Sequence, residues 1–194
     1  MHYKREIGVI LTLAAMLTVP AAQAHGLGTD GAGFLAGLSH PVLGLDHVLG
    51  MLAVGLWGAQ QGGRAVWRLP LAFAGMMFVG AALAPTGLVL PAVEVGVTAS
   101  VVVLGLMLAA AARTAPSASL ALVGTFALFH GYAHAVEIPQ MAPVFSYALG
   151  LLTTTALLQL AGIALGREFR RANGEHLLRW GGAAIACGGM LLLA

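Results

Sequence analysis

The chain has 194 residues, of which 59% are hydrophobic and only 8% charged, and its mean hydropathy is +0.92. A water-soluble domain carries about a quarter of its residues as charged side chains, so this composition excludes most soluble folds and places most of the chain in a lipid bilayer. The formal net charge of +2 also argues against a nucleic-acid-binding surface.

Residues 1–24 have the features of a secretory signal peptide. A basic start and an apolar core of signal-peptide length are followed by Ala22-Gln23-Ala24, a small-x-small cleavage site. We expect cleavage after this site, which leaves residues 25–194 as one transport domain with His25 at its N-terminus, outside the cytoplasm. The alternative is an uncleaved first membrane anchor, although the apolar core is shorter than the ~20 residues that a spanning helix needs.

Six apolar stretches follow, separated by short connections that contain turn residues. They are residues 37–59, 69–83, 92–112, 119–136, 144–165 and 177–193. Strands of a membrane barrel would alternate apolar and polar residues over about ten positions, and none of these stretches does so. We therefore predict an all-α fold, a polytopic membrane protein with six transmembrane helices after a cleavable N-terminal signal peptide.

The arginines predict the orientation of the six helices, because cytoplasmic loops collect Arg and Lys. With the mature N-terminus outside, the inner loops and the start of the last helix hold every arginine of the mature chain. These are Arg64, Arg68, Arg113, Arg167, Arg170, Arg171 and Arg179. We expect a multi-pass protein of the cell inner membrane whose mature N- and C-termini both face the periplasm.

Two of the predicted membrane helices contain ionisable residues at membrane depth. The first contains His40-Pro41-Val42-Leu43-Gly44-Leu45-Asp46-His47, and the fourth contains Phe129-His130-Gly131-Tyr132-Ala133-His134-Ala135-Val136-Glu137. A charged group at the centre of a bilayer costs ~2.5 to 3.5 kcal/mol, so such residues normally pair, face the bundle interior and mark a pathway.

The helical repeat predicts how these residues are arranged. At about 100° per residue, His130, His134 and Glu137 share one helix face, and His40 and His47 share another face on a first helix that Pro41 bends. Both motifs lie slightly to the outer side of the centres of their helices, so we expect them at the same depth.

Four imidazoles with carboxylates at one depth fit a divalent transition metal best. Neutral imidazole is a ligand for nickel, cobalt, copper and zinc, and a carboxylate offsets the charge of the ion or orients the other ligands. A single histidine pair at i,i+4 is weak evidence, but two clusters on separate membrane helices favour a metal. Glu94, at the outer start of the third helix, and His25 are candidates for capturing the cation at the outer mouth.

The two motifs, in this order and after a signal peptide, resemble the HupE/UreJ family of nickel and cobalt permeases. The resemblance covers essentially the whole mature chain, although Ala135 stands where a glycine is expected. It implies uptake of nickel or cobalt, in preference to zinc, by a protein that is not an enzyme. The metal-handling residues that it implies are His40, Asp46, His47, His130, His134 and Glu137.

The metal ion would then be cargo and not a permanently bound cofactor. The expected partners are the divalent ion and the lipid bilayer, without nucleic acid. A homo-oligomer, accessory transport proteins and metalloenzyme-maturation proteins stay open as further partners. The mature chain has no lysine and no Gly-x4-Gly-Lys-Ser/Thr loop, so it does not hydrolyse ATP in the P-loop manner.

Two other classes of function remain open from the sequence. A haem-binding or other metal-binding redox protein would use His47 and His130 as axial ligands, against which the neighbouring Asp46 argues. An intramembrane metal hydrolase could use two histidines and a glutamate, but His134 to Glu137 is not the His-Glu-x-x-His arrangement.

Overall fold

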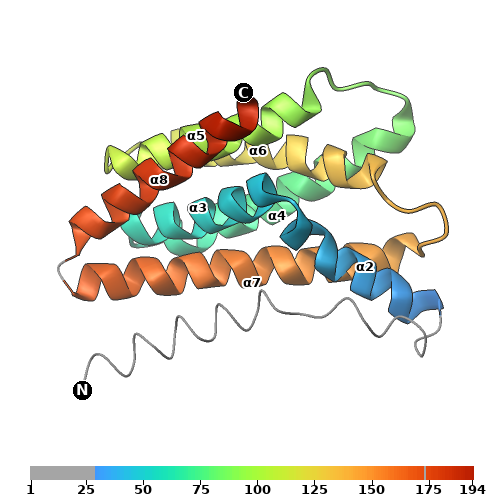
Figure 1. Cartoon of the computed structure of the whole chain (residues 1–194), viewed down its shortest axis with the longest axis horizontal. Helices are drawn as coiled ribbons and strands as arrows, with labels where there is room; N and C mark the ends of the chain where they lie inside the picture. The colour runs from blue at the N-terminus through green and yellow to red at the C-terminus, as the bar shows by residue number, and fades with distance from the viewer. Residues whose placement is uncertain (1–28, 173) are drawn as a thin grey trace.

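A computed structural model of the chain describes residues 29–172 and 174–194 (Figure 1). These residues form seven α-helices and one short 3-10 helix, with no strand among them, which confirms the all-α prediction. The predicted signal peptide and His25 lie outside the described residues.

The helices correspond to the six apolar stretches. In chain order they are α2 (Thr29–Leu43), α3 (Leu45–Gln61), α4 (Ala65–Leu83), η1 (Ala84–Thr86), α5 (Val93–Ala109), α6 (Pro116–Val136), α7 (Val144–Arg171) and α8 (Glu175–Leu193). Helices α4, α6, α7 and α8 are each long and apolar enough to cross a membrane. Helices α2 and α3 are long and apolar enough to cross a membrane only when they are taken together as a bent pair, and α5 is a shorter apolar helix. The chain is thus an all-helical membrane protein, and the count of six crossings stays a prediction.

The prediction of one continuous first helix is wrong. Helices α2 and α3 meet at Gly44 and are bent by 83° relative to each other. Pro41, which we expected to bend the helix, lies inside α2. Pro41 donates no backbone hydrogen bond, and glycine costs about 1 kcal/mol inside a helix, so together they make this the weakest point of the segment. The chain changes direction at the glycine, where φ is −100° and ψ is 113°.

Close packing at glycines joins α2 to α7 and also three further pairs of helices. Gly55 and Gly162 bring the backbones of α3 and α7 into contact, Gly131 does the same for α6 and α4, and Gly105 and Gly182 for α5 and α8. A Cβ atom at any of these five positions would overlap a backbone atom of the partner helix. Small residues therefore set the spacing of the bundle, as is common between membrane helices.

The contacts also give the direction of these three further pairs. Helices α3 and α7 run parallel, since Leu52 and Ala59 face Gly162 and Gly166 in that order. Helices α4 and α6 run parallel by the same criterion, whereas α5 and α8 run antiparallel.

The arginines that we predicted to face the cytoplasm gather at one end of the bundle. Arg170 donates a hydrogen bond of 2.7 Å to the carbonyl of Ala59, and Arg179 donates one of 2.9 Å to the carbonyl of Ala109. The connections 84–92 and 137–143 lie at the opposite end, on the right of Figure 1. The fold agrees with the alternation of segments inferred from the arginines, and we refer to the two ends as inner and outer.

Helix α3 contributes to the core of the bundle and carries Asp46 and His47 of the first histidine motif at its outer end. Met51, Val54 and Trp57 are fully buried in the core that α3 forms with α4, α5 and α6. His47 lies one turn before Met51, and His130 follows the buried Ala127 of α6 by three residues. The core therefore ends where the polar residues begin.

Candidate metal centre

Four imidazole rings from three helices meet at the outer end of this core. His40 comes from the last turn of α2, His47 from the first turn of α3, and His130 and His134 from α6. The ring centroid of His134 lies 4.5 Å from that of His47 and 5.1 Å from that of His40, and the His47 and His130 centroids are 5.3 Å apart. The two motifs therefore meet, as their equal predicted depth requires.

The prediction that His40 and His47 share a face of one helix is wrong. The break at Gly44 places them on different helices, so the seven-residue spacing does not bring them to one face. Their ring centroids are nevertheless only 6.3 Å apart.

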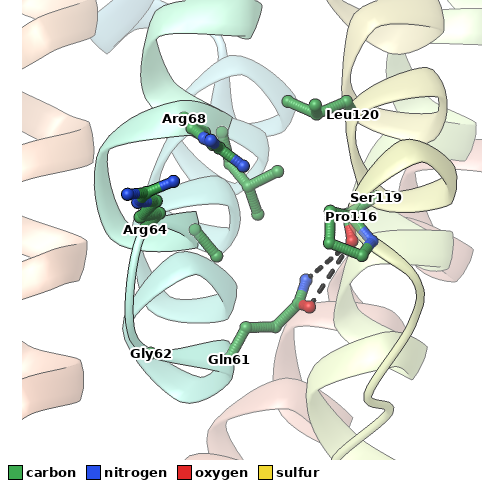
Figure 2. Close-up of a pocket in the computed structure, with 9 residues that line it drawn as sticks. Gln61, Gly62, Arg64, Arg68, Pro116, Ser119 and Leu120 are labelled. Atoms are coloured by element: carbon green, nitrogen blue, oxygen red, sulfur yellow. Dashed lines mark hydrogen bonds between the residues drawn. The ribbon is translucent and has the colours of Figure 1, made fainter.

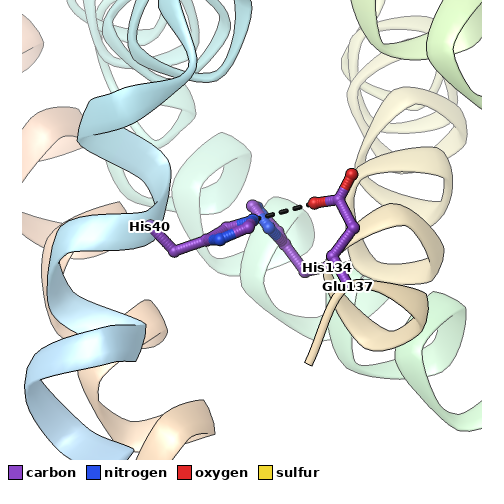
Figure 3. Close-up of side chains that lie close together, drawn as sticks. All are labelled: His40, His134 and Glu137. Atoms are coloured by element: carbon purple, nitrogen blue, oxygen red, sulfur yellow. Dashed lines mark hydrogen bonds and ion pairs between the residues drawn. The ribbon is translucent and has the colours of Figure 1, made fainter. Parts of the chain in front are cut away.

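The outer part of the cluster consists of His40, His134 and Glu137. One potential ligand atom from each of these residues lies within 4.8 Å of the others (Figure 3). The Nε2 atom of His40 is 2.8 Å from Oε2 of Glu137, the C-cap residue of α6. An ionised carboxylate only accepts hydrogen bonds, so His40 donates and keeps the lone pair of its other ring nitrogen free. Both ring nitrogens of His134 are buried without a partner among the described residues.

The inner part of the cluster consists of His47 and His130, each held by its Nδ1 atom. Oδ1 of Asp46 accepts hydrogen bonds from both the backbone N–H and Nδ1 of His47, each of 2.8 Å. Nδ1 of His130 donates to the carbonyl of Phe126 at 2.9 Å. A neutral imidazole with its proton on Nδ1 carries a lone pair on Nε2, and this is how metal-binding histidines are usually oriented. Asp46 is therefore placed to orient His47.

The cluster has an accessible end and a buried end. The side chains of Glu137 and His40 are 39% and 27% exposed, whereas the residues His47, His134 and His130 are 8%, 1% and 0% exposed. The Nε2 atoms of His47 and His130 are buried and have no hydrogen-bond partner among the described residues. A cation that arrived at Glu137 and His40 would therefore meet three buried imidazoles beyond them.

Of the two residues proposed for the outer mouth, the structure describes only Glu94. Glu94 is exposed in the first turn of α5 and does not belong to the group of mutually close ligand atoms. His25 lies outside the described residues. A role of either residue in capturing the cation stays a prediction.

Comparison with known proteins bears on the resemblance stated above. A family model described as HupE / UreJ protein matches residues 13–192. The chain belongs to the HupE/UreJ family. Protein HupE of Rhizobium leguminosarum bv. viciae is 41% identical over 186 residues, which cover 95% of this chain and 96% of that protein. No solved structure matches the chain.

In this member of the HupE/UreJ family, two residues of the site were missed in the sequence. Gly50 leaves space beside the site, since a Cβ atom there would lie 3.3 Å from Nε2 of His130 and 3.4 Å from Oγ of Ser100. Tyr147 of α7 packs its ring 5.8 Å from that of His40, centroid to centroid. The only signal for Gly50 was its position one turn after His47. Tyr147 lies near the start of an apolar stretch, where it is typical of an interfacial aromatic residue.

A cavity of about 360 Å³ lies at the inner end of the bundle, far from the histidines (Figure 2). It contains the hydrogen bond of 3.1 Å from Nε2 of Gln61 to Oγ of Ser119. Its lining includes the guanidinium groups of Arg64 and Arg68, and no lining residue is a histidine or a carboxylate. Two positive charges without an acid make this cavity unsuitable for a cation.

Proposed function

We propose that this protein is a membrane permease for the uptake of a divalent transition-metal ion, with nickel or cobalt preferred over zinc. The observation that carries the proposal is the cluster of four imidazoles, three of which have buried nitrogens without partners among the described residues: His47, His130 and His134. A buried polar atom without a partner is costly, and a metal ion would supply the missing partner for several of them at once. Membership of the HupE/UreJ family supports the same cargo.

The exposure of the ligands suggests the direction of the route. Glu137 and His40 are the accessible members, so they capture the hydrated cation from the outer side. His134 lies between His40 and His47, so it passes the ion from the outer ligands to the inner ones. His47 and His130 then replace part of the water shell at the buried end of the cluster.

The carboxylates have different parts in this proposal. Glu137 is at the accessible end and adds a negative charge that attracts the cation. Asp46 acts through His47. Its carboxylate accepts a hydrogen bond from Nδ1–H of His47, which holds the ring in place and keeps the lone pair on Nε2 of His47 free. Removing such a supporting group typically costs about 10–100-fold in metal affinity.

Imidazole and carboxylate ligands do not by themselves select nickel or cobalt over zinc. The family resemblance carries that part of the proposal. A gradient, a coupled ion or a partner protein supplies the driving force, since the mature sequence has no P-loop. We place the protein in the cell inner membrane with both mature termini in the periplasm, because the arginine-rich end belongs to the cytoplasm.

Metal accumulation in cells that lack their own nickel, cobalt and zinc uptake systems tests the proposal. Cells expressing the unsubstituted chain should accumulate nickel or cobalt, and cells expressing His130→Ala at the same membrane level should not. His176→Ala is the matched control, because His176 is an exposed histidine in the first turn of α8. Equal accumulation in all strains, including cells without the protein, would refute the permease.

The redox and hydrolase alternatives are not favoured by any feature of the described part of the chain. A haem protein would show a strong band in the visible absorption spectrum of the purified chain, and we expect no such band.

A further inference from the structure

Helix α7 carries three buried polar side chains that are not among the potential ligands of the candidate metal centre. Tyr147 and Thr155 are each 1% exposed, and Gln159 is 3% exposed. The hydroxyl groups of Tyr147 and Thr155 and the Nε2 atom of Gln159 have no hydrogen-bond partner among the described residues. The three residues are separated by multiples of four, so they follow one side of the helix over about 18 Å.

This side of α7 packs against the broken segment that carries two of the histidines. Thr154 donates a hydrogen bond of 2.6 Å to the carbonyl of Leu38 in α2, and Gly162 packs on the backbone of α3 at Leu52 and Leu56. The polar side chains therefore lie along the junction of α7 with α2 and α3, and away from the lipid.

The row begins at the metal centre and continues inward. Tyr147 contacts His40, with 5.8 Å between the ring centroids. Gly55 of α3 packs on the carbonyl of Gln159, and His47 precedes Gly55 by eight residues on the same helix. Because α3 and α7 are parallel, Gln159 lies about 12 Å deeper than His47, and Thr155 lies about 6 Å deeper.

Of the three consecutive threonines in α7, only the one that belongs to this row has a buried hydroxyl without a partner among the described residues. Thr153 is exposed and donates to the carbonyl of Leu149 at 2.7 Å, and Thr154 is satisfied by Leu38. Only the hydroxyl of Thr155 is buried without a partner. Valine has nearly the same shape and would avoid this cost, so an unpaired hydroxyl here calls for a polar occupant such as water or an ion.

We propose that this row lines the ion route. Tyr147 flanks the route at the outer histidine His40, and Thr155 and Gln159, which lie deeper than His47, form its inner leg and accept the partly hydrated divalent cation from the histidine cluster. The inference rests on the proposed permease function. Hydroxyl and carboxamide oxygens are neutral and bind nickel or cobalt more weakly than imidazole does, and conduction requires such sites so that the ion can leave. A half-turn of the carboxamide of Gln159 places its oxygen where its nitrogen now lies. We name these three residues the α7 lane.

Two measurements on single variants test the lane. The first is nickel accumulation per molecule of membrane protein, and the second is equilibrium nickel binding to the purified full chain in detergent. Thr155→Val and Gln159→Leu should each lower accumulation by about tenfold and leave binding unchanged, because the histidine cluster is intact. Thr155→Ser keeps the hydroxyl and should accumulate as much nickel as the unsubstituted chain. Thr153→Val, on the lipid-facing side of the same helix, is the matched control and should be silent.

Each other outcome has a definite meaning. Normal accumulation in both Thr155→Val and Gln159→Leu would overturn the lane. Loss of binding together with accumulation would also overturn it, since these residues would then belong to the binding cluster. If the unsubstituted chain itself accumulates no metal, the proposed permease function fails and not the lane alone. Lower accumulation in Thr155→Ser than in the unsubstituted chain would show that packing, and not the hydroxyl, matters at this position.

Discussion

The substitution Gly44→Ala should disturb the candidate metal centre while sparing the fold. A Cβ atom at Gly44 would lie 2.8 Å from Nδ1 of His47 and 3.0 Å from Oδ1 of Asp46. Alanine adopts the φ of −100° and ψ of 113° found at this position without strain, so the backbone does not resist the change. The methyl group therefore acts only on the hydrogen-bonded pair of His47 and Asp46.

The size of the effect follows from these distances. Ordinary van der Waals contact begins near 3.4 Å, so the ring of His47 must move by about 0.6 Å (3.4 − 2.8). Metal–ligand distances tolerate only about 0.2 Å, and disturbing a supporting hydrogen bond costs about 10–100-fold in affinity. We expect nickel binding to weaken by that factor, or about 1.4–2.7 kcal/mol. The stability of the metal-free protein should change by no more than about 1 kcal/mol.

Two assays on the same purified variant separate binding from stability. Equilibrium dialysis with nickel measures the affinity, and thermal unfolding in detergent without metal measures stability. Gly75→Ala is the control, because Gly75 is exposed in α4 and a Cβ atom there meets nothing within 4 Å. If Gly44→Ala binds nickel within about twofold of the unsubstituted chain, the observed position of the His47 and Asp46 pair is not what the metal needs.

Three further predictions concern the cluster and its support. His130→Ala and Asp46→Asn should abolish uptake at normal membrane levels. Met51→Leu should leave uptake nearly unchanged, because Met51 is a fully buried core residue. Uptake assays, with immunoblots to compare the membrane levels of the variants, test both expectations. Uptake should fall as external pH drops from 7.5 to 5, because protons compete with the metal ion for the imidazole nitrogens and only neutral imidazole binds metal; flat uptake over this range would contradict this competition. Gly131→Ala should lower the free energy of unfolding by about 1–3 kcal/mol, because its Cβ would overlap the backbone of Met77, and an unchanged melting temperature would contradict this packing.

Much of the fold could be predicted because lipid permits few solutions. Long apolar runs must be helical, and the arginines mark one side of the membrane. The ends of the helices were harder to predict. Helix α7 continues to Arg171, beyond the predicted end at residue 165, because arginine forms helix well and extends its charged group away from apolar surroundings.

The break in the first segment could not be predicted from its own residues. Pro41 and Gly44 both weaken a helix, and the choice between them depends on how α2 packs on α7. A Cβ at Gly37 would overlap the backbone of Tyr147, so α2 is held closely against α7 through the turn that contains Pro41. The chain can change direction only after this contact, which is at Gly44.

The sequence could indicate that the two histidine motifs meet, but not the contacts within the cluster. Intramembrane histidines and carboxylates are conspicuous in an apolar sequence. Nothing in the order of residues shows that Asp46 accepts a hydrogen bond from the ring of His47, or that the carbonyl of Phe126 orients His130. Those relations depend on which ring nitrogen faces which neighbour, and only the packed helices determine it.

Three of the close helix pairs have a consequence for the symmetry of the molecule. The first three segments correspond in order to the last three: α2–α3 to α6, α4 to α7, and α5 to α8. If each segment is exchanged for its counterpart, the α3–α7 pair becomes the α6–α4 pair. The α5–α8 pair becomes itself. Parallel pairs map onto parallel pairs, and the antiparallel pair onto itself. This is the pattern of an inverted repeat, whose two-fold axis lies in the plane of the membrane. Each half supplies one histidine motif from its first segment, so the rings of His47 and His130 meet across the boundary. Neither half can form the cluster alone, and a rotation of one half against the other would separate the rings of His47 and His130.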